Sequence, residues 1–222
     1  AFAHPTKPIG AFMTKEEADH LVAERGYDVE LWEKSSRLGG NLWAAGSPTF
    51  KHDVLRLIDY MKTQVNKLGV RVVYNKDATA DEIVAYDADK VILACGSHSI
   101  VPPIPGIEHA EVSDGYLLGT REPGKNVVVI GGGLVGCETA AFMAEKAESV
   151  TIVEMLDDVL LTAGHCLNND QALKAMLDER GIAKVCGAKV TQVTADSLTY
   201  EKDGEAVTIP ADTVIIAAGY RS

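Results

Sequence analysis

The stretch NVVVIGGGLVGCETAAF, residues 126–142, predicts the fold of the second half of this chain. An apolar run typical of a β-strand leads into the pattern G-x-G-x-x-G at Gly131, Gly133 and Gly136, and an alanine-rich helical segment follows. A second strand-like run, SVTIVE, ends in Glu154, 23 residues after Gly131. This order of strand, glycine loop, helix, strand and acidic residue is typical of a dinucleotide-binding unit.

Each residue of the motif has an expected role toward a dinucleotide. Gly131 permits the tight turn, Gly133 lets the backbone approach a pyrophosphate, and Gly136 lets the helix pack closely against the strand. The helix N-terminus adds free N–H groups and partial positive charge for the phosphates. If the glycine turn served only packing, the acidic Glu154, at the spacing expected for a residue that binds a ribose, would be unexplained. The segment MLDD after Glu154 adds two negative charges and no arginine, so NADH is expected in preference to NADPH.

An earlier stretch repeats this unit with altered glycines. A shift of 121 residues aligns Gly10 with the first glycine of the later loop and Glu33 with the later acidic residue, without a gap. In the earlier copy Phe12 and Lys15 replace the second and third glycines, so the ordinary phosphate cradle cannot form unchanged. Lys15 either neutralises a phosphate or is solvated. Glu33 either holds a ribose or ends a strand that faces solvent.

The rest of the chain alternates segments of strand and helix pattern. Strands are expected over 27–33, 70–75 and 90–97 (YDVELWE, VRVVYN and KVILACGS), and helices over 14–25 and 51–69. Three prolines in residues 97–108 indicate an extended crossover. Short β-type runs from residue 189 onward indicate a small antiparallel meander before a final buried strand over 213–217. Strands alternating with helices favour an α/β fold with parallel sheets covered on both faces.

Composition excludes several classes of function. The chain has 222 residues, of which 46% are hydrophobic and 24% charged, and its formal net charge is −11. This negative charge argues against binding to nucleic acid, which needs clustered Lys and Arg. No apolar run approaches the roughly 20 residues that span a membrane, and the N-terminus lacks the order of a secretion signal. A cytoplasmic location and no membrane partner are therefore expected.

The four cysteines indicate neither a metal site nor a redox pair. Cys95, Cys137, Cys166 and Cys186 are widely spaced and form no C-x-x-C, so buried free thiols are expected. No acid–base pair is evident in the sequence. We therefore assign no catalytic residue and no metal ligand.

Residues 30–72, which begin ELWEKSSRLGGNLWAAG, resemble the FAD-binding segment of flavoproteins with two dinucleotide-binding domains. More narrowly, the chain from about Lys7 to Ser222 resembles the C-terminal part of the 2,4-dienoyl-CoA reductase, NADH:flavin oxidoreductase and enoate reductase family. The specific markers are the E-K-x-x-x-L-G-G element (residues 33–40) and the strand-end elements ILACGS and IIAAGY. Disulfide reductases share the two-domain plan, but NLWAAG stands where they need a cysteine pair.

The resemblance implies two nucleotide sites. An FAD site would include Gly10, Glu33, Arg37, Gly39, Gly40 and Leu42, with Ala78 beside the adenine and Cys95 and Gly96 at a strand-end turn. An NADH site would include Gly131, Gly133, Leu134, Val135, Gly136, Glu154 and Gly219. The cofactors expected are therefore NAD(H) and FAD, although Phe12 and Lys15 argue against ordinary FAD binding.

The resemblance also implies the domain plan. We expect an α/β protein of two Rossmann-like, doubly wound, mostly parallel nucleotide-binding domains, the second inserted in the first, with the small antiparallel meander. Residues 1–104 would be the first segment of the FAD-binding-like domain, and residues 105–219 the NAD(H)-binding domain. Residues 220–222 would begin a truncated return to the first domain.

Members of the family that the chain resembles pass a hydride from NADH to FAD, and then electrons through an iron-sulfur cluster to FMN in a separate barrel. Neither the barrel nor cluster-ligand cysteines are encoded here, so the chain is not expected to be active alone. The expected partner is the FMN and iron-sulfur part of the same parent enzyme. The sequence leaves open whether the protein also forms a homo-oligomer. The alternative is an NAD(H)-binding module whose first unit has become a structural partner that does not bind FAD.

Overall fold

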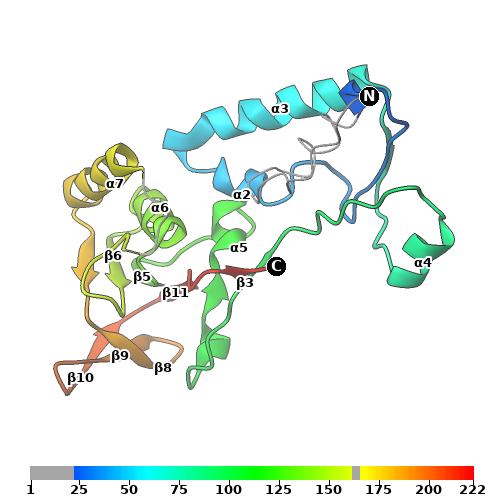
Figure 1. The fold of residues 1–222 in the computed structure, drawn as a ribbon. Helices are drawn as coiled ribbons and strands as arrows, with labels where there is room; N and C mark the ends of the chain where they lie inside the picture. The colour runs from blue at the N-terminus through cyan, green and yellow to red at the C-terminus, as the bar shows by residue number, and fades with distance from the viewer. Residues whose placement is uncertain (1–22, 162–165) are drawn as a thin grey trace. The chain divides into compact units, whose positions relative to one another are not determined.

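The computed structural model describes residues 23–161 and 166–222. The chain divides into two compact units (Figure 1). Unit 1 comprises the chain up to Gly46 and Lys51–Gly96, and unit 2 comprises Ser47–Phe50 and Ser97–Ser222. The predicted domain limits, 1–104, 105–219 and 220–222, remain predictions.

Unit 2 is built on a parallel five-stranded sheet with the order β4-β11-β5-β6-β7. Its strands are β4 (Glu111–Val112), β5 (Asn126–Ile130), β6 (Ser149–Val153), β7 (Ala183–Val185) and β11 (Thr213–Ile216). The connecting helices are α5 (Ser113–Leu117), α6 (Leu134–Met143) and α7 (Leu167–Glu179). Strands β5 and β11 are buried along nearly their whole length, as is typical of central strands in a parallel sheet covered on both faces.

Two apolar cores lie on the two faces of this sheet. Successive side chains of a strand point to opposite faces. Accordingly, Val129 of β5 packs in one core with Ala140 of α6, and its neighbour Val128 packs in the other core with Leu198 of the meander. The continuous apolar run of β5 therefore serves both faces, which explains why it carries no polar alternation.

The predicted meander is confirmed. Strands β8 (Lys189–Val193), β9 (Ser197–Lys202) and β10 (Glu205–Pro210) form an antiparallel sheet in the order β10-β9-β8. The turn between β9 and β10 places Asp203 at φ 54° and Gly204 at φ 81°. Two residues of positive φ are typical of the tight hairpin turn whose twist matches its strands. A second antiparallel pair joins β3 (His98–Ser99) to β12 (Tyr220–Arg221), and the 3₁₀ turn η2 (Ile107–His109) precedes β4.

From residue 27 onward, unit 1 contains a parallel pair of strands and three helices. The strands are β1 (Glu30–Trp32) and β2 (Arg71–Val73), and the helices are α2 (Leu42–Ala45), α3 (His52–Lys67) and α4 (Ala80–Ala85). The 3₁₀ turn η1 (Thr49–Lys51), which precedes α3, belongs to both units, because Thr49 and Phe50 are assigned to unit 2. Helix α3 buries Ile58, Met61 and Val65 on one face. Val65 packs with Leu31 of β1. The predicted strands over 27–33 and 70–75 and the predicted helix over 51–69 are thus confirmed.

One predicted strand is wrong. Residues 91–97 form no regular secondary structure, and Val91, Ile92 and Leu93 are 51%, 51% and 74% exposed. A buried strand needs hydrogen-bonded neighbours on its sheet. The internal repeat makes residues 5–9 the equivalent of β5, the strand beside β11, and those residues lie outside the described ranges. The predicted helix over 14–25 lies mostly outside them as well, although Gly26, directly after it, has the left-handed φ of 84° that is common at the end of a helix.

The α/β fold class is confirmed, with parallel sheets in both units and an antiparallel meander in unit 2. None of the helices within residues 23–161 and 166–222 combines the length and apolar character that a membrane span requires.

Candidate nucleotide-binding site

The motif residues of unit 2 gather at the carboxyl edge of its parallel sheet. Gly131 follows β5, Glu154 follows β6 and Ala217 follows β11. Backbone hydrogen bonds continue the sheet to this edge, because Gly131 N donates to Val153 O and Ala217 N donates to Ile130 O, each at 2.9 Å. Open parallel sheets bind ligands at the carboxyl ends of their strands. The fold therefore puts these residues where a nucleotide is expected.

Two glycines of the glycine loop (residues 131–136) leave no room for a side chain. Gly131 has a φ of 105°, and a Cβ there would lie 2.5 Å from the carbonyl oxygen of Ala217. A Cβ on Gly136 would lie 2.0 Å from the carbonyl oxygen of Gly131. The first turn of α6 therefore packs directly on the strand-end turn, the arrangement that the first and third glycines of the motif permit.

Gly133 is different, because its backbone does not require glycine. It is the N-cap residue of α6, with φ −72° and ψ −175°, an extended conformation that any residue adopts. Glycine has no side chain with which to cap the first N–H groups of α6. Such a helix N-terminus suits an anion, because its N–H groups and the helix dipole both favour negative charge.

The carboxylate of Glu154 is anchored to the glycine loop. Its Oε2 accepts a hydrogen bond from Gly132 N at 2.5 Å, and its Oε1 accepts one from Leu156 N at 2.8 Å. The side chain is half-buried. Because each carboxylate oxygen offers about two acceptor positions, both oxygens retain capacity for the hydroxyl groups of a ribose.

The loop of residues 155–160 folds back over the glycine loop. Leu160 N donates to Gly132 O at 2.7 Å, and Val159 is 1% exposed. A Cβ on Gly132 would lie 2.8 Å from Val159 Cγ1. The position between the first two motif glycines therefore also excludes a side chain, although the motif itself leaves it unspecified.

Cys137 contributes a buried thiol to the glycine loop. It lies in the first turn of α6, is 0% exposed, and its Sγ donates to Gly132 O at 3.3 Å. Burial raises the pKa of this thiol to about 12, and the negative charge of Glu154 adds to the shift. Cys137 therefore stays protonated near neutral pH and keeps its hydrogen bond to the loop.

The other cysteines correct the sequence-based prediction. All four are free, as predicted, and Cys186 is half-buried. Cys95 and Cys166 are exposed, so the prediction of buried thiols is wrong for these two. Cys95 is exposed because it lies in the segment that forms no strand, and Cys166 is exposed where it precedes α7.

The remaining predicted residues of unit 2 lie at the same edge of the sheet. Leu134 and Val135 lie within the glycine loop as the first two residues of α6, and Leu134 is 42% exposed. Gly219 follows β11, has a φ of 102°, and its carbonyl accepts a hydrogen bond from Ile100 N at 2.9 Å. The structure thus brings all predicted residues of the second site to the glycine loop or to the strand ends beside it.

In unit 1 the paired glycines of the E-K-x-x-x-L-G-G element form a tight turn. Gly39 and Gly40 have φ values of 119° and 44°, which favour glycine. Trp43 Nε1 donates to Leu38 O at 2.8 Å, and a Cβ on Gly39 would lie 2.6 Å from that nitrogen. The Arg37 guanidinium lies over the Trp43 ring, 4.3 Å from its centre. The backbone conformation of this turn therefore accounts for the glycine at both positions.

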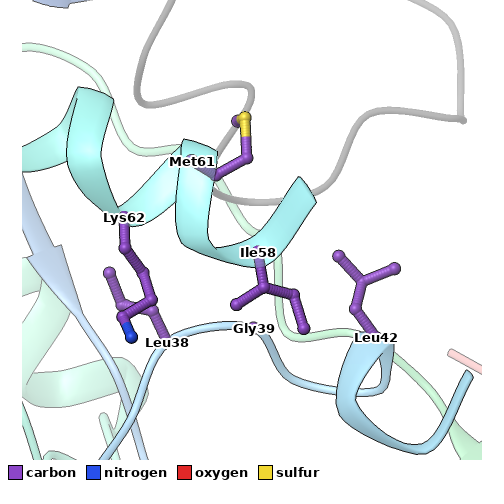
Figure 2. Close-up of a pocket in the computed structure, with 6 residues that line it drawn as sticks. All are labelled: Leu38, Gly39, Leu42, Ile58, Met61 and Lys62. Atoms are coloured by element: carbon purple, nitrogen blue, oxygen red, sulfur yellow. The ribbon is translucent and has the colours of Figure 1, made fainter. Parts of the chain in front are cut away.

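A shallow apolar hollow adjoins this turn (Figure 2). Leu38, Gly39, Leu42, Ile58, Met61 and Lys62 line about 180 Å³ of open space. In Figure 2 Ile58 extends from α3 toward Gly39 and Leu42. This space is open to solvent, and the residues that line it leave no enclosed room even for a water molecule. The hollow therefore does not hold a flavin by itself.

The other predicted residues of the first site are dispersed. Glu33 Oε1 accepts a hydrogen bond from Ser35 N at 2.7 Å, in the turn that follows β1. Ala78 and Gly96 are exposed, and Gly96 has a φ of 72°. Gly10, with the substituted positions Phe12 and Lys15, lies outside the described residues.

Sequence reasoning missed part of the second site. The missed residues are Gly132, Cys137, Leu156, Val159 and Leu160, which contact the glycine loop or Glu154. The run of three glycines at 131–133 was a signal for the middle one. The others depend on how the 155–160 loop folds back, which no local pattern specifies.

Comparison with known proteins agrees with this geometry. The family model described as pyridine nucleotide-disulphide oxidoreductase matches residues 14–222. A bilirubin reductase of Mediterraneibacter gnavus (strain CC55_001C) is 34% identical over 215 residues, which are 96% of this chain and 33% of that protein. A cinnamate reductase of Clostridium sporogenes is also 34% identical over 215 residues, 96% of this chain and 32% of that protein.

A solved structure shows a similar fold. The 2-naphthoyl-CoA reductase complex with 2-naphthoyl-CoA matches with a TM-score of 0.85 and 29% identity, over 92% of this chain and 31% of that chain. The chain thus spans about a third of the length of the relatives that it matches. The resemblance to the nucleotide-binding part of the dienoyl-CoA reductase and enoate reductase type is confirmed.

Proposed function

This chain belongs to the pyridine nucleotide-disulphide oxidoreductase family, and we propose that it is the part of a flavin-dependent reductase that binds NADH and FAD. NADH supplies two electrons as a hydride, and FAD accepts them. The proposed domains are the FAD-binding-like segment 1–104, the NAD(H)-binding domain 105–219 and the start of a return at 220–222. A cytoplasmic location is part of the same proposal.

The observation that supports an NADH site most directly is the conformation of Gly133. Gly131 and Gly136 are explained by contacts within the protein, but the φ of −72° at Gly133 needs no glycine. The close approach of a ligand to the N-terminus of α6 accounts for a residue without a side chain at this position. The pyrophosphate of a dinucleotide fits this role.

The neighbouring residues would orient the rest of the nucleotide. Glu154 would accept hydrogen bonds from the ribose hydroxyls, because its two oxygens keep acceptor capacity beside the glycine loop. Leu134 and Val135 would flank the pyrophosphate on the first turn of α6. Gly219, beyond β11, would let the chain pass close to the far end of the bound nucleotide.

In unit 1, FAD would be held by the turn of Gly39 and Gly40, with Arg37 near the phosphates and Glu33 at the ribose. The left-handed backbone of both glycines supports a close approach of the cofactor. Leu42, Ala78, Cys95, Gly96 and Gly10 complete the proposed set. Phe12 and Lys15 favour the second candidate, an NAD(H)-binding module that does not retain FAD.

The proposed partner is an FMN and iron-sulfur part of the same parent enzyme, which would receive the electrons. The names of the similar proteins contain three compounds with conjugated or aromatic double bonds: bilirubin, cinnamate and 2-naphthoyl-CoA. We also propose that the parent enzyme reduces a conjugated double bond, which takes up two electrons and two protons. The chain alone is expected to catalyse no such reduction.

The test is a titration of the purified protein with NADH, followed by nicotinamide fluorescence. Gly133→Ala should weaken NADH binding about tenfold, which corresponds to ~1.4 kcal/mol, because its methyl group meets the pyrophosphate. The thermal midpoint should stay unchanged, since the Gly133 backbone accepts alanine. Gly115→Ala in α5 is the control and should leave NADH binding unaltered. Equal NADH affinities in the parent protein and Gly133→Ala would contradict the proposal.

A further inference from the structure

An ion pair lies in the loop that covers the glycine loop. Lys174 on α7 donates to Asp158 Oδ2 at 2.5 Å. Asp158 Oδ1 accepts a second hydrogen bond from Val159 N at 2.8 Å, which fixes the carboxylate. The side chains of Asp158 and Lys174 are 51% and 36% exposed, so a ligand can approach them from solvent.

The residues on both sides of Asp158 connect this pair to the proposed ribose site. Before it, Leu156 N donates to Glu154 Oε1 at 2.8 Å. After it, Leu160 N donates to the carbonyl of Gly132 at 2.7 Å, and Gly132 N in turn donates to Glu154 Oε2. Asp158 is therefore held on a short loop whose two ends are attached to Glu154 and to the glycine loop.

Each member of the pair stabilises the charge of the other. The hydrogen bond from Lys174 lowers the pKa of Asp158, and the same bond raises the pKa of Lys174. Both groups are charged near neutral pH, and their charges nearly cancel. Without Lys174, the negative charge of Asp158 would add to those of Glu154 and Asp157 on the same short segment. Without Asp158, the Lys174 ammonium would lose its ion-pair partner and keep only the weaker influence of Asp170, one turn earlier on α7.

We propose that the Asp158–Lys174 pair determines how strongly the site rejects a nucleotide with a ribose 2′-phosphate. This role rests on the proposed function, binding of NADH at the glycine loop. In the intact protein Lys174 cancels Asp158, and Glu154 discriminates against the phosphate. Asp158 then serves mainly to keep Lys174 from attracting the phosphate. A short acidic segment and a lysine from the next helix act together as a specificity determinant.

The proposal predicts effects of opposite sign for the two partners. Asp158→Asn leaves Lys174 free to attract the phosphate, so the ratio of the NADPH to the NADH dissociation constant should fall about threefold. Lys174→Gln leaves Asp158 to repel the phosphate, so the same ratio should rise about threefold. The double variant should return close to the parent ratio. Both shifts should shrink as salt is raised, because the pair is exposed.

A matched control separates a local effect from a change in net charge. Lys125 and Glu148 form a similar exposed pair at 2.6 Å, but they precede β5 and β6 and so lie at the amino edge of the sheet. Glu148→Gln changes the net charge by the same amount as Asp158→Asn and should leave the ratio unaltered.

The titrations use NADH and NADPH with the purified protein, followed by nicotinamide fluorescence. Shifts of the same sign in Asp158→Asn and Lys174→Gln, or no shift in either, would overturn the role of the pair while NADH binding itself stands. A protein that binds neither nucleotide would instead overturn the proposed function.

Discussion

A Cβ on Gly136 would lie 2.0 Å from the carbonyl oxygen of Gly131, closer than any real contact of a side chain with backbone. Gly136 is buried in the first turn of α6, and Gly131 is half-buried in the turn after β5. Neither a flexible side chain nor solvent separates them. The spacing of the motif glycines is therefore a packing requirement as well as a means of approaching a ligand.

Gly136→Ala is expected to destabilise unit 2 by more than about 2 kcal/mol, because the backbone of the turn or of α6 must shift. The measurement is the unfolding midpoint in denaturant. Gly115→Ala in α5 is the matched helical control. Its Cβ would meet the flexible Arg121 side chain at 3.1 Å, so a change within about 1 kcal/mol is expected there. Equal midpoints for Gly136→Ala and the parent protein would show that the turn yields easily.

The buried thiol of Cys137 should be unreactive in the folded protein. Iodoacetamide should modify the exposed Cys95 and Cys166, whereas Cys137, with a pKa of about 12 and no exposed surface, should react only after unfolding. Mass spectrometry of peptides from native and unfolded samples measures this directly. Early labelling of Cys137 in the native protein would mean that the first turn of α6 opens.

The same thiol should make stability fall at alkaline pH. The folded pKa of Cys137, about 12, lies above the ordinary value of 9.0, so unfolding releases a proton in this range. The contribution is intact below pH 9 and declines by up to about 1.4 kcal/mol per pH unit as the pH rises toward 12. Cys137→Ser, whose hydroxyl does not ionise there, should lose this part of the decline. Parallel pH profiles for the two proteins would contradict the assignment.

Local sequence patterns predicted the framework of unit 2 well, because its elements are encoded locally. The apolar run of β5, the motif glycines and the hairpin at Asp203 and Gly204 each impose a conformation through their own backbone or spacing. The sequence patterns did not predict helix α7, because only Leu173 and Leu177 are buried along its length and its apolar pattern is weak.

The contacts that complete the candidate site could not be predicted in this way. The hydrogen bond from Gly132 to Glu154 joins residues that are 22 apart in sequence, and the pair of Asp158 and Lys174 joins residues 16 apart. Such contacts depend on the path of the 155–160 loop over the glycine loop. The prediction of a strand over 90–97 is wrong for a related reason. An apolar run becomes a strand only beside a hydrogen-bonded neighbour, and that neighbour comes from a distant part of the sequence.

Retention of FAD should be weak in the purified protein. In the alignment of the internal repeat, Phe12 corresponds to Gly133, whose counterpart a pyrophosphate would approach, and Lys15 corresponds to Gly136, which lets the helix pack closely. Replacing both, Phe12→Gly with Lys15→Gly, should increase the amount of bound flavin, measured from its visible absorbance per protein molecule. A full complement of FAD in the unmodified protein would show that this steric reasoning fails, and would favour the two-cofactor reading over the NAD(H)-binding module.

Glu154 should make the second unit prefer NADH to NADPH. Its carboxylate is fixed by Gly132 N and Leu156 N, so a 2′-phosphate of about −2 charge cannot displace it without breaking hydrogen bonds. Because the side chain is half-buried, the repulsion exceeds that of an exposed like-charge pair, and we expect at least about tenfold, or ~1.4 kcal/mol, in favour of NADH.

Two substitutions separate the charge of Glu154 from its support of the loop. Glu154→Gln keeps one acceptor oxygen but removes the charge, whereas Glu154→Ala removes both, so the Ala variant should bind both nucleotides more weakly. The ratio of the NADPH to the NADH dissociation constant should fall in both variants, because both lose the charge that repels the 2′-phosphate. The loss of loop support in Glu154→Ala weakens the binding of both nucleotides alike and therefore cancels in the ratio. Fluorescence titration of the three proteins measures it. Equal affinities for the two nucleotides in the parent protein, or an unchanged ratio in Glu154→Ala, would mean that another group discriminates between them.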